Sequence, residues 1–341
     1  MFTFRAVHAL LGELPREANV KLARAVLGLA AVAPFCIASP AWGWGCKGHQ
    51  TVALIAEKHM SPGAKALAED LLRNNPVDPA LSRYCKDLGP DAMSDAATWA
   101  DDERNVKAET TGWHFFDIPR GTDRSVMNQF CTLQDSCVTE ALREKIKALK
   151  DATRPAAERA DALRYIIHFV GDEHQPLHCT TNNDRGGNCV PAQYFDNKPE
   201  ASSKDASSFR PNLHGIWDTN IVERDMGART VQQFADDLDA KFQPQIAAWQ
   251  QAGADIDGWA WESHQTAEDI AYGKLPKKLK IEPLVFPPIT SCAQDKKVSE
   301  RILKKHIALG QAYQDAVAPV MEQRLELAGV RLAMILNELA R

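Results

Sequence analysis

The sequence predicts a single, mainly α domain, and three observations carry this prediction. Apolar residues recur at three- and four-residue spacing in most periodic segments, whereas the strict alternation typical of strands is scarce. Hydrophobic residues make up 45% of the 341 residues, enough for a sizeable core. No internal repeat and no linker divides the chain into two cores. We therefore expect one domain of about 300 residues with long loops.

The first element, residues 1–43, is predicted to be a signal peptide that is removed. Its apolar stretch 25–37 follows Lys21 and Arg24, precedes small residues, and is shorter than the roughly 20 residues that cross a bilayer. Cleavage after Ala41 and cleavage after Gly43 both fit the pattern. We expect a secreted or periplasmic protein with no membrane segment after processing.

The remaining elements are predicted to be helices joined by polar loops. Residues 51–59 and 64–73 form one helical pair with Ser61, Pro62 and Gly63 as the break, and 139–150 and 155–169 form another. Residues 299–341 have the pattern of one long amphipathic helix. Between them, 182–188 is expected to be a turn-rich loop and 196–208 a polar surface insertion.

Charge and cysteine content narrow the class of protein. Removal of 1–43 takes four basic residues from 40 and two acidic residues from 45, which leaves a net charge of −7. This balance excludes binding of nucleic acid through bulk positive charge. Seven cysteines remain, and disulfides are the default in an exported protein. Three pairs fit by spacing, although the sequence does not fix the connectivity and one cysteine is left over: Cys46–Cys85, Cys131–Cys137 and Cys179–Cys189.

The residues that suggest chemistry are histidines and aspartates at helical spacing. His168 and Asp172 lie four apart and share a helix face, Pro176 bends or ends that helix, and His178 then turns back toward the same face. A second pair, His214 and Asp218, repeats the spacing. A single such pair is most often a surface ion pair. Three ionisable groups among apolar neighbours favour a metal, and this ligand chemistry suits zinc.

Six segments occur in the order found in the S1/P1 nuclease family, which the chain resembles over essentially its whole mature length. They are WGCKGH (44–49), WAD (99–101), WHFFD (113–117), HFVGDEHQPLH (168–178), DRGGN (184–188) and HGIWD (214–218), and the closing GVRLAMILN (329–337) is also similar. The resemblance implies a phospholipase C/P1 nuclease-like helical fold with three Zn²⁺ ions in one cleft.

The ligands that this resemblance implies come from matching positions. The first zinc ion would take Asp101, His114, His168 and Asp172, and the second would take His178, His214 and Asp218. The third would take the main-chain amine and carbonyl of the mature N-terminal Trp44, His49 and the other oxygen of Asp172. The family spacing between its terminal Trp and His matches Trp44 and not Trp42, which selects cleavage after Gly43.

The implied function is a secreted nuclease that cleaves single-stranded DNA and RNA to 5′-nucleotides and acts on 3′-nucleotides, with a hydroxide held between zinc ions as the nucleophile. By the same resemblance Arg104 would neutralise the phosphate and Asp117 would orient the attacking water. Phe115 would stack on a base, with Phe116 as the other possibility, and Asn220 would contact a base edge. We expect a monomer.

Two other functions and four other histidines complete the predictions. A zinc phospholipase C is the alternative enzyme, but its relatives carry Glu where Asp218 stands and a longer Trp-to-His spacing. A non-catalytic zinc or nucleotide-binding protein is the other alternative.

His174 is expected to hydrogen-bond around the metal ligands. The remaining three are expected to be structural or exposed because no ligand lies at suitable spacing: His59, His264 and His306.

Overall fold

Helices account for most of the described chain, as the sequence predicts. In this computed structural model, placement is described for residues 44–133, 136–203, 205–283, 285, 289–294 and 298–341. The predicted signal peptide, with both of its cleavage positions, lies outside the described residues. Among those that are described, no helix has the length and apolar character needed to cross a bilayer.

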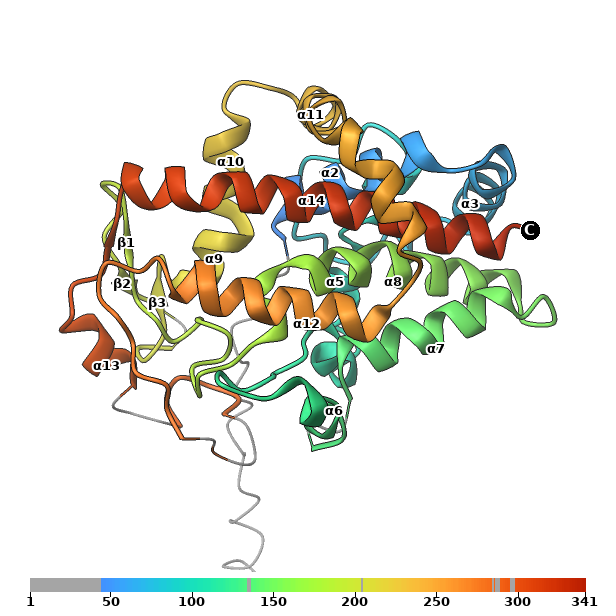
Figure 1. Cartoon of the computed structure of the whole chain (residues 1–341). Helices are drawn as coiled ribbons and strands as arrows, with labels where there is room; N and C mark the ends of the chain where they lie inside the picture. Colours follow the sequence, from blue (N-terminus) through green and yellow to red (C-terminus); the bar gives the residue numbers. More distant parts are fainter. Residues whose placement is uncertain (1–43, 134–135, 204, 284, 286–288, 295–297) are drawn as a thin grey trace, which may run out of the picture. The chain divides into compact units, whose positions relative to one another are not determined.

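The α-helices, labelled in Figure 1, are α2 (Cys46–His59), α3 (Pro62–Asn74), α4 (Ala92–Ala96), α5 (Trp99–Glu103), α6 (Asn128–Leu133), α7 (Val138–Lys150), α8 (Ala156–His174), α9 (Leu213–Gly215), α10 (Ile221–Met226), α11 (Val231–Gln251), α12 (Ile256–Thr266), α13 (Val298–Leu303) and α14 (Gln311–Leu339). Short 3₁₀ turns are η1 (Ala108–His114), η2 (Arg124–Val126) and η3 (Pro176–Cys179), and π turns are η4 (Ile216–Asn220) and η5 (Ala267–Tyr272).

Strands are short and few in the described chain, in agreement with the prediction. They are β1 (Gln193–Tyr194), β2 (Glu200–Ala201), β3 (Phe209–Arg210) and β4 (Ala308–Leu309). β1 pairs with β4 in parallel, and β2 pairs with β3 antiparallel with Glu200 opposite Arg210. The polar insertion expected at 196–208 thus contains β2 and leads directly into the β3 strand of a small hairpin.

Local sequence fixes where several helices begin. The Ser61 side chain caps α3 by accepting from the Ala64 amide, and Pro62 fills the first turn, where no amide hydrogen is needed. Thr230 and Gln233 form a reciprocal capping box at the start of α11. These caps satisfy backbone amides that the helices themselves leave unpaired.

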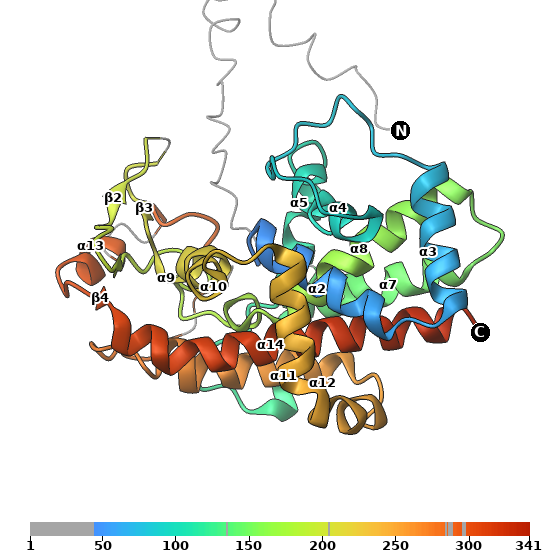
Figure 2. The same ribbon diagram turned by 90° about the horizontal axis from the view of Figure 1, so that it is seen from above.

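The core lies around α8 and the face that α2 and α14 share. α8 is buried on all sides from Tyr165 to His174, so most of this segment is apolar; its polar side chains are the site residues His168 and Asp172, with Glu173 and His174 at its end. α14 packs against α2, α8 and α11, as the two views show (Figures 1 and 2). Gly329 lets α14 approach α2 closely, because a Cβ at this position would lie 2.4 Å from Ile55 Cγ2.

The prediction of a single helix over 299–341 is wrong. α13 ends at Leu303, His306 adopts a positive φ of 48°, and β4 follows before Gly310 starts α14. The physical reason is the pairing of β4 with β1, which uses the backbone groups of Ala308 and Leu309 for a sheet instead of a helix.

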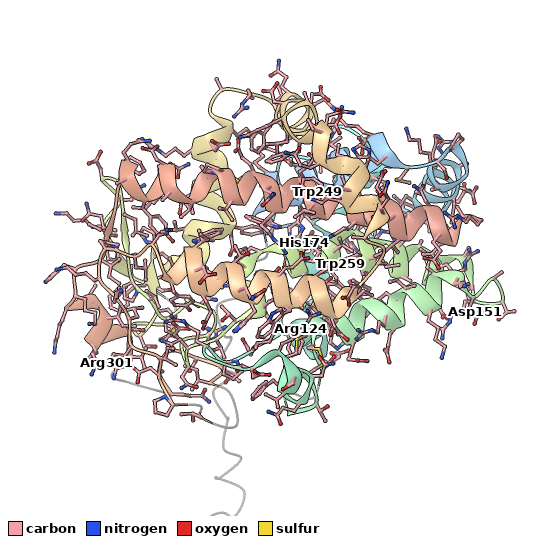
Figure 3. The ribbon with its side chains drawn as sticks, in the orientation of Figure 1. Arg124, Asp151, His174, Trp249, Trp259 and Arg301 are labelled. Atoms are coloured by element: carbon pink, nitrogen blue, oxygen red, sulfur yellow. A yellow bond between two sulfur atoms is a disulfide. The ribbon has the colours of Figure 1, made fainter. Side chains whose placement is uncertain are left out.

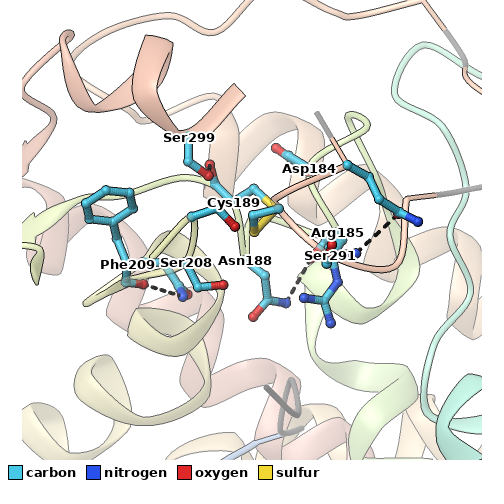
Figure 4. Close-up of a disulfide and its surroundings, with 12 residues drawn as sticks. Asp184, Arg185, Asn188, Cys189, Ser208, Phe209, Ser291 and Ser299 are labelled. Atoms are coloured by element: carbon cyan, nitrogen blue, oxygen red, sulfur yellow. Dashed lines mark hydrogen bonds between the residues drawn. A yellow bond between two sulfur atoms is a disulfide. The ribbon is translucent and has the colours of Figure 1, made fainter. Parts of the chain in front are cut away.

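Two of the three suggested disulfides are confirmed and one is wrong. Cys46–Cys85 and Cys131–Cys137 are formed. Cys189 bonds to Cys292, 103 positions away, with a Cα–Cα distance of 5.4 Å (Figure 4). Cys179 is therefore the cysteine left over, and it lies buried with its thiol toward the Glu173 carbonyl. Short spacing misled the prediction, since the fold brings the distant Cys292 closer to Cys189.

Candidate metal centre

The central helix α8 supplies two of the predicted ligands and then stops where the sequence predicts. His168 and Asp172 project from one face, with His168 Nε2 3.1 Å from Asp172 Oδ2. α8 ends at His174 because Gln175, which precedes Pro176, has extended backbone angles. The short η3 turn that follows places His178 Nδ1 3.6 Å from Asp172 Oδ1.

The first group of ligand atoms consists of His114, His168 and Asp172. His114 Nδ1 lies 2.9 Å from Asp172 Oδ2 and 3.1 Å from His168 Nε2. Asp101 Oδ1 completes the group at 3.7 Å from His168 Nε2 and 3.8 Å from His114 Nδ1. Ligands about 2.0 to 2.1 Å from a tetrahedral zinc ion lie about 3.3 Å from one another. The spacing therefore suits one ion among these four side chains.

The second group consists of His178, His214 and Asp218. His214 Nε2 lies 3.4 Å from Asp218 Oδ2, and His178 Nε2 lies 3.8 Å from Asp218 Oδ1. The π turn η4 carries Asp218 and widens the helix between α9 and α10 at this point. Gln175 donates to Asp218 Oδ1 and accepts from the Leu177 amide, so it orients this carboxylate. The ligand atoms of these three residues all lie within 4.8 Å of one another.

His49 contacts Oδ1 of Asp172, the carboxylate oxygen other than the one that faces His114 and His168. Its Nε2 is 3.3 Å from Asp172 Oδ1, and its ring stacks on that of His168 at 3.9 Å between centroids. Gly171 makes room for this ring, since a Cβ there would lie 2.7 Å from His49 Nδ1. Trp44 is buried nearby and packs over Gly48.

Backbone carbonyl oxygens determine which ring nitrogen of three histidines faces the other ligands. In three histidines Nδ1 bonds to a carbonyl oxygen, which only accepts, so Nδ1 carries the hydrogen and the neutral ring presents its lone pair on Nε2. The three pairs are His168 with Ala97 at 2.7 Å, His178 with His114 at 2.8 Å and His214 with Gly186 at 2.7 Å. This is the tautomer that an Nε2 metal ligand requires.

The electrostatics fit a cation-binding site. Burial lowers the pKa of His49 and of His114 to about 4, which keeps both rings neutral and able to bind a metal. Burial by itself would lower the pKa of His168 too, but the negative charges of Asp172 and Asp101 raise it to about 9. Burial also opposes ionisation of Asp172, yet His168 and His178 hold its pKa well below its usual range.

Several ring and carboxylate atoms of the candidate ligands have no hydrogen-bond partner within the described chain although they are buried. They are both ring nitrogens of His49, Asp101 Oδ1, His114 Nε2 and Asp172 Oδ1. Buried polar atoms are costly unless they are paired. Three of these atoms face the neighbouring ligands, namely His49 Nε2, Asp101 Oδ1 and Asp172 Oδ1, and they fit bound metal ions better than a structural histidine cluster.

The residues predicted to contact substrate lie at different distances from these groups. Arg104 is buried, with one guanidinium nitrogen 3.2 Å from Asp101 Oδ1. Phe115 is partly exposed, and its ring centroid lies 4.7 Å from that of His178, whereas Phe116 is completely buried in the core. Of the two candidates for base stacking, the geometry favours Phe115.

Asp117 faces other charges than those of the ligands. It is partly buried, and burial raises its pKa to about 6, with Asp184 adding to the rise and Arg185 opposing it. Arg185 also feels the charge of Arg104, so the two arginines and Asp117 share one region. In Figure 4, Asn188 donates to the Arg185 carbonyl and closes the loop ahead of Cys189.

An open pocket of about 660 Å³ adjoins the second group and contains Asp218, Asn220 and Tyr84. Asn220 is partly exposed in it, and Tyr84 is 44% exposed, with Asp101 and Asp218 among the charges that act on its hydroxyl. A larger cavity of about 880 Å³ between α6 and α7 contains none of the predicted site residues.

Sequence reasoning missed Gln175, Arg185 and Tyr84. Gln175 and Arg185 lie inside segments that carry the family resemblance, so their place in those segments could have suggested a role near the ligands. Tyr84 lies in a loop with no motif, and only the fold brings it to the pocket.

The other histidines do not all behave as predicted. His174 Nδ1 bonds to the Val170 carbonyl at 2.8 Å and Nε2 bonds to Arg331 at 2.9 Å, so its partners are the helix backbone and α14 and not the metal ligands. It lies beside Trp259, between α12 and α14 (Figure 3). His264 bonds to the Cys179 carbonyl, and His306 is exposed, as predicted.

His59, expected to be structural or exposed, has two carboxylates as neighbours in space. Its Nε2 lies 2.7 Å from Asp239 Oδ1 and 3.9 Å from Glu326 Oε1. Spacing along the chain gave no sign of this, because the two carboxylates come from α11 and α14, at least 180 positions away.

Comparison with known proteins gives a family match and several distant relatives. Residues 44–341 match the family model described as S1/P1 Nuclease. The chain is 27% identical over 316 residues to Endonuclease 4 of Arabidopsis thaliana, covering 87% of this chain and 89% of that protein. It is 26% identical over 200 residues to Nuclease S1 of Aspergillus oryzae and 27% identical over 192 residues to Nuclease P1 of Penicillium citrinum. These two alignments cover 57% and 55% of this chain, and 60% and 62% of the fungal proteins, less than two thirds of their length.

Proposed function

We propose the function of this chain from the premise that it belongs to the S1/P1 nuclease family, whose model matches residues 44–341. The proposed activity is hydrolysis of phosphodiester bonds in single-stranded DNA and RNA to 5′-nucleotides, together with 3′-nucleotidase activity. The observation that carries the proposal is the convergence of buried imidazoles and carboxylates on Asp172. Relatives named as nucleases and endonucleases support the reaction class.

Three zinc ions are the proposed cofactors. One would be held by Asp101, His114, His168 and Asp172, and one by His178, His214 and Asp218. A third would be held by His49, Asp172 and the main chain of Trp44. When bound, such ions lower the pKa of water toward neutrality and offset the negative charge of a phosphodiester.

The third set of ligands requires a processed N-terminus. A main-chain nitrogen binds a metal only as a free, neutral amine, so residues 1–43 must be removed first. The burial of Trp44 against Gly48, the hydrogen bond of 2.6 Å from the Gly45 amide to the Asp218 carbonyl, and the family match that begins at Trp44 support this assignment. Three disulfides support export to an oxidising compartment, secreted or periplasmic.

The protein's own side chains would bind and orient the substrate. Arg104 lies where a guanidinium would hydrogen-bond a phosphate next to the Asp101 ligand. Phe115 offers a ring face beside His178 for an unpaired base, which a duplex would hide. Asn220 and Tyr84 line the adjoining pocket, where a neighbouring nucleotide would lie.

Asp117 is the proposed group that orients the attacking water. Its carboxyl is poised to change protonation near neutral pH, and Arg185 lies close enough to influence it. The proposed active unit is a monomer.

The test compares three activities on one preparation whose mature N-terminus has been verified as Trp44. Release of acid-soluble nucleotides from single-stranded DNA and RNA, with duplex DNA as the matched substrate, is expected to exceed hydrolysis of a phosphatidylcholine analogue. Lipid turnover without nucleotide release would establish the phospholipase alternative. Zinc binding without any hydrolysis would establish the non-catalytic one.

A further inference from the structure

A second group of metal-type side chains lies where α2, α11 and α14 meet. His59 is the last residue of α2, Asp239 lies in α11 and Glu326 in α14. Their ligand atoms all lie within 4.8 Å of one another. We call this group, His59, Asp239 and Glu326, the helix-junction site.

Glu326 is the side chain that demands an explanation. It is 0% exposed, and neither of its carboxylate oxygens has a hydrogen-bond partner within the described chain. The nearest cationic side chain on α2, Lys58, bonds instead to Asp236 at 2.5 Å. A buried carboxylate without donors is costly, so such a group is retained where something else pairs with it.

The geometry supplies one common position for such a partner. Glu326 Oε1 points toward His59 Nε2 at 3.9 Å, and Asp239 Oδ1 lies 2.7 Å from the same nitrogen. His59 and Asp239 are 16% and 26% exposed, so the group opens to solvent on one side and an ion could enter. Three rigid helices hold the three donors.

We propose that the helix-junction site binds a zinc ion. One imidazole nitrogen and two carboxylate oxygens form a donor set that zinc accepts, with a remaining position for water. Calcium and magnesium prefer six or more oxygen ligands, and this site has three protein donors, one of them nitrogen. The competing explanation is a His59–Asp239 ion pair beside a protonated Glu326, with no metal.

This site is separate from the centre described above. His49 and His59 are ten positions apart on α2, which corresponds to about 15 Å along a helix. An ion at the helix junction would fasten the end of α2 to α11 and α14. Because the ion binds only the folded arrangement of these helices, it would stabilise the fold. The inference does not depend on the proposed nuclease activity.

The test counts zinc ions. Metal-stripped protein is titrated with zinc against a chromophoric chelator, and bound zinc is confirmed by elemental analysis. The variants Glu326→Gln and His59→Gln each remove one donor, and Asp236→Asn removes a negative charge one turn from Asp239 without removing a donor. We expect both donor variants to bind one zinc ion fewer than the wild type, and Asp236→Asn to bind the same number.

Two further readouts make the result decisive. Zinc should raise the melting temperature of the wild type more than that of either donor variant. The nuclease rate of each donor variant at saturating zinc should stay within about twofold of the wild-type rate. If Glu326→Gln does not fold, His59→Gln, at a partly exposed position, gives the same count. Equal zinc content in the wild type and the folded donor variants would overturn the proposal. So would the loss of one ion in Asp236→Asn as well.

Discussion

The replacement Gly171→Ala tests the metal centre with the smallest possible change. Gly171 lies inside α8, directly before Asp172, and its missing side chain gives the His49 ring its place. The added methyl group would lie 2.7 Å from His49 Nδ1 and 3.0 Å from its Cε1. Ordinary contacts begin near 3.4 Å, so the ring must retreat by about 0.7 Å.

The size of the effect follows from that displacement. Metal–ligand distances tolerate errors of about 0.2 Å, so a shift more than three times larger should remove the ion that His49 helps to hold. Misplacement by about 1 Å in an active site costs roughly 100-fold in rate. Alanine is meanwhile about 1 kcal/mol better than glycine inside a helix. Overpacking in a core costs about 1 to 3 kcal/mol, and the helix gain offsets about 1 of it, so the metal-free fold should lose at most about 2 kcal/mol while metal and activity are lost.

Three quantities are measured: zinc content, the rate of single-stranded DNA hydrolysis, and the melting temperature in the presence of chelator, monitored by circular dichroism. We expect one zinc ion fewer, a rate lowered by about 100-fold, and a metal-free melting temperature lowered by no more than about 8 °C. Gly310→Ala is the control, because a Cβ at Gly310 meets no atom within 4 Å and its φ is −111°. Full zinc content and an unchanged rate in Gly171→Ala would refute the role of His49.

Four further outcomes are expected. Asp172→Asn weakens the contacts to His114, His168 and His49, so at least two zinc ions should be lost and the rate should fall at least about 100-fold; normal turnover with full zinc would contradict this. Phe115→Ala should raise KM by about 5- to 150-fold, the loss of one stacked base, with zinc content unchanged; zinc loss would show that the ring is structural. Retaining Gly43 ahead of Trp44 should cost one zinc ion, measured against the trimmed protein. Burial raises the pKa of Glu326 to about 8, so its folded form keeps a proton that the unfolded chain releases above about pH 4.5. In chelator, unfolding free energy should thus fall between about pH 5 and 8, by at most about 1.4 kcal/mol per pH unit, and Glu326→Gln should remove this fall in urea titrations.

The sequence predicted the elements whose signals are local. The i,i+4 pairs His168–Asp172 and His214–Asp218, and the stop at Pro176, follow from helical geometry alone. The family resemblance extended this to residues 49, 101 and 114, which no spacing rule connects. The structure brings all of them together around Asp172.

Interactions between distant segments escaped prediction. The break between α13 and α14 depends on β4 pairing with β1, and nothing in 299–341 itself announces a partner more than 100 positions earlier. Cys189–Cys292 and the helix-junction site are missed for the same reason. α11 was not predicted, although its buried residues Phe234, Leu238, Phe242 and Ile246 recur at four-residue spacing.

The carbonyl contacts of His168, His178 and His214 have a consequence for how the protein acquires its ions. The proton on each ring is located by main-chain oxygen, which every amino acid at the acceptor position provides. Loading an ion on these rings then requires no ring flip and no tautomer exchange, only the release of the Nε2 proton where the ring is charged, as on His168. The rate of metal uptake should follow access to the cleft, and changes of side chain at position 97 should leave it untouched wherever the backbone path is kept.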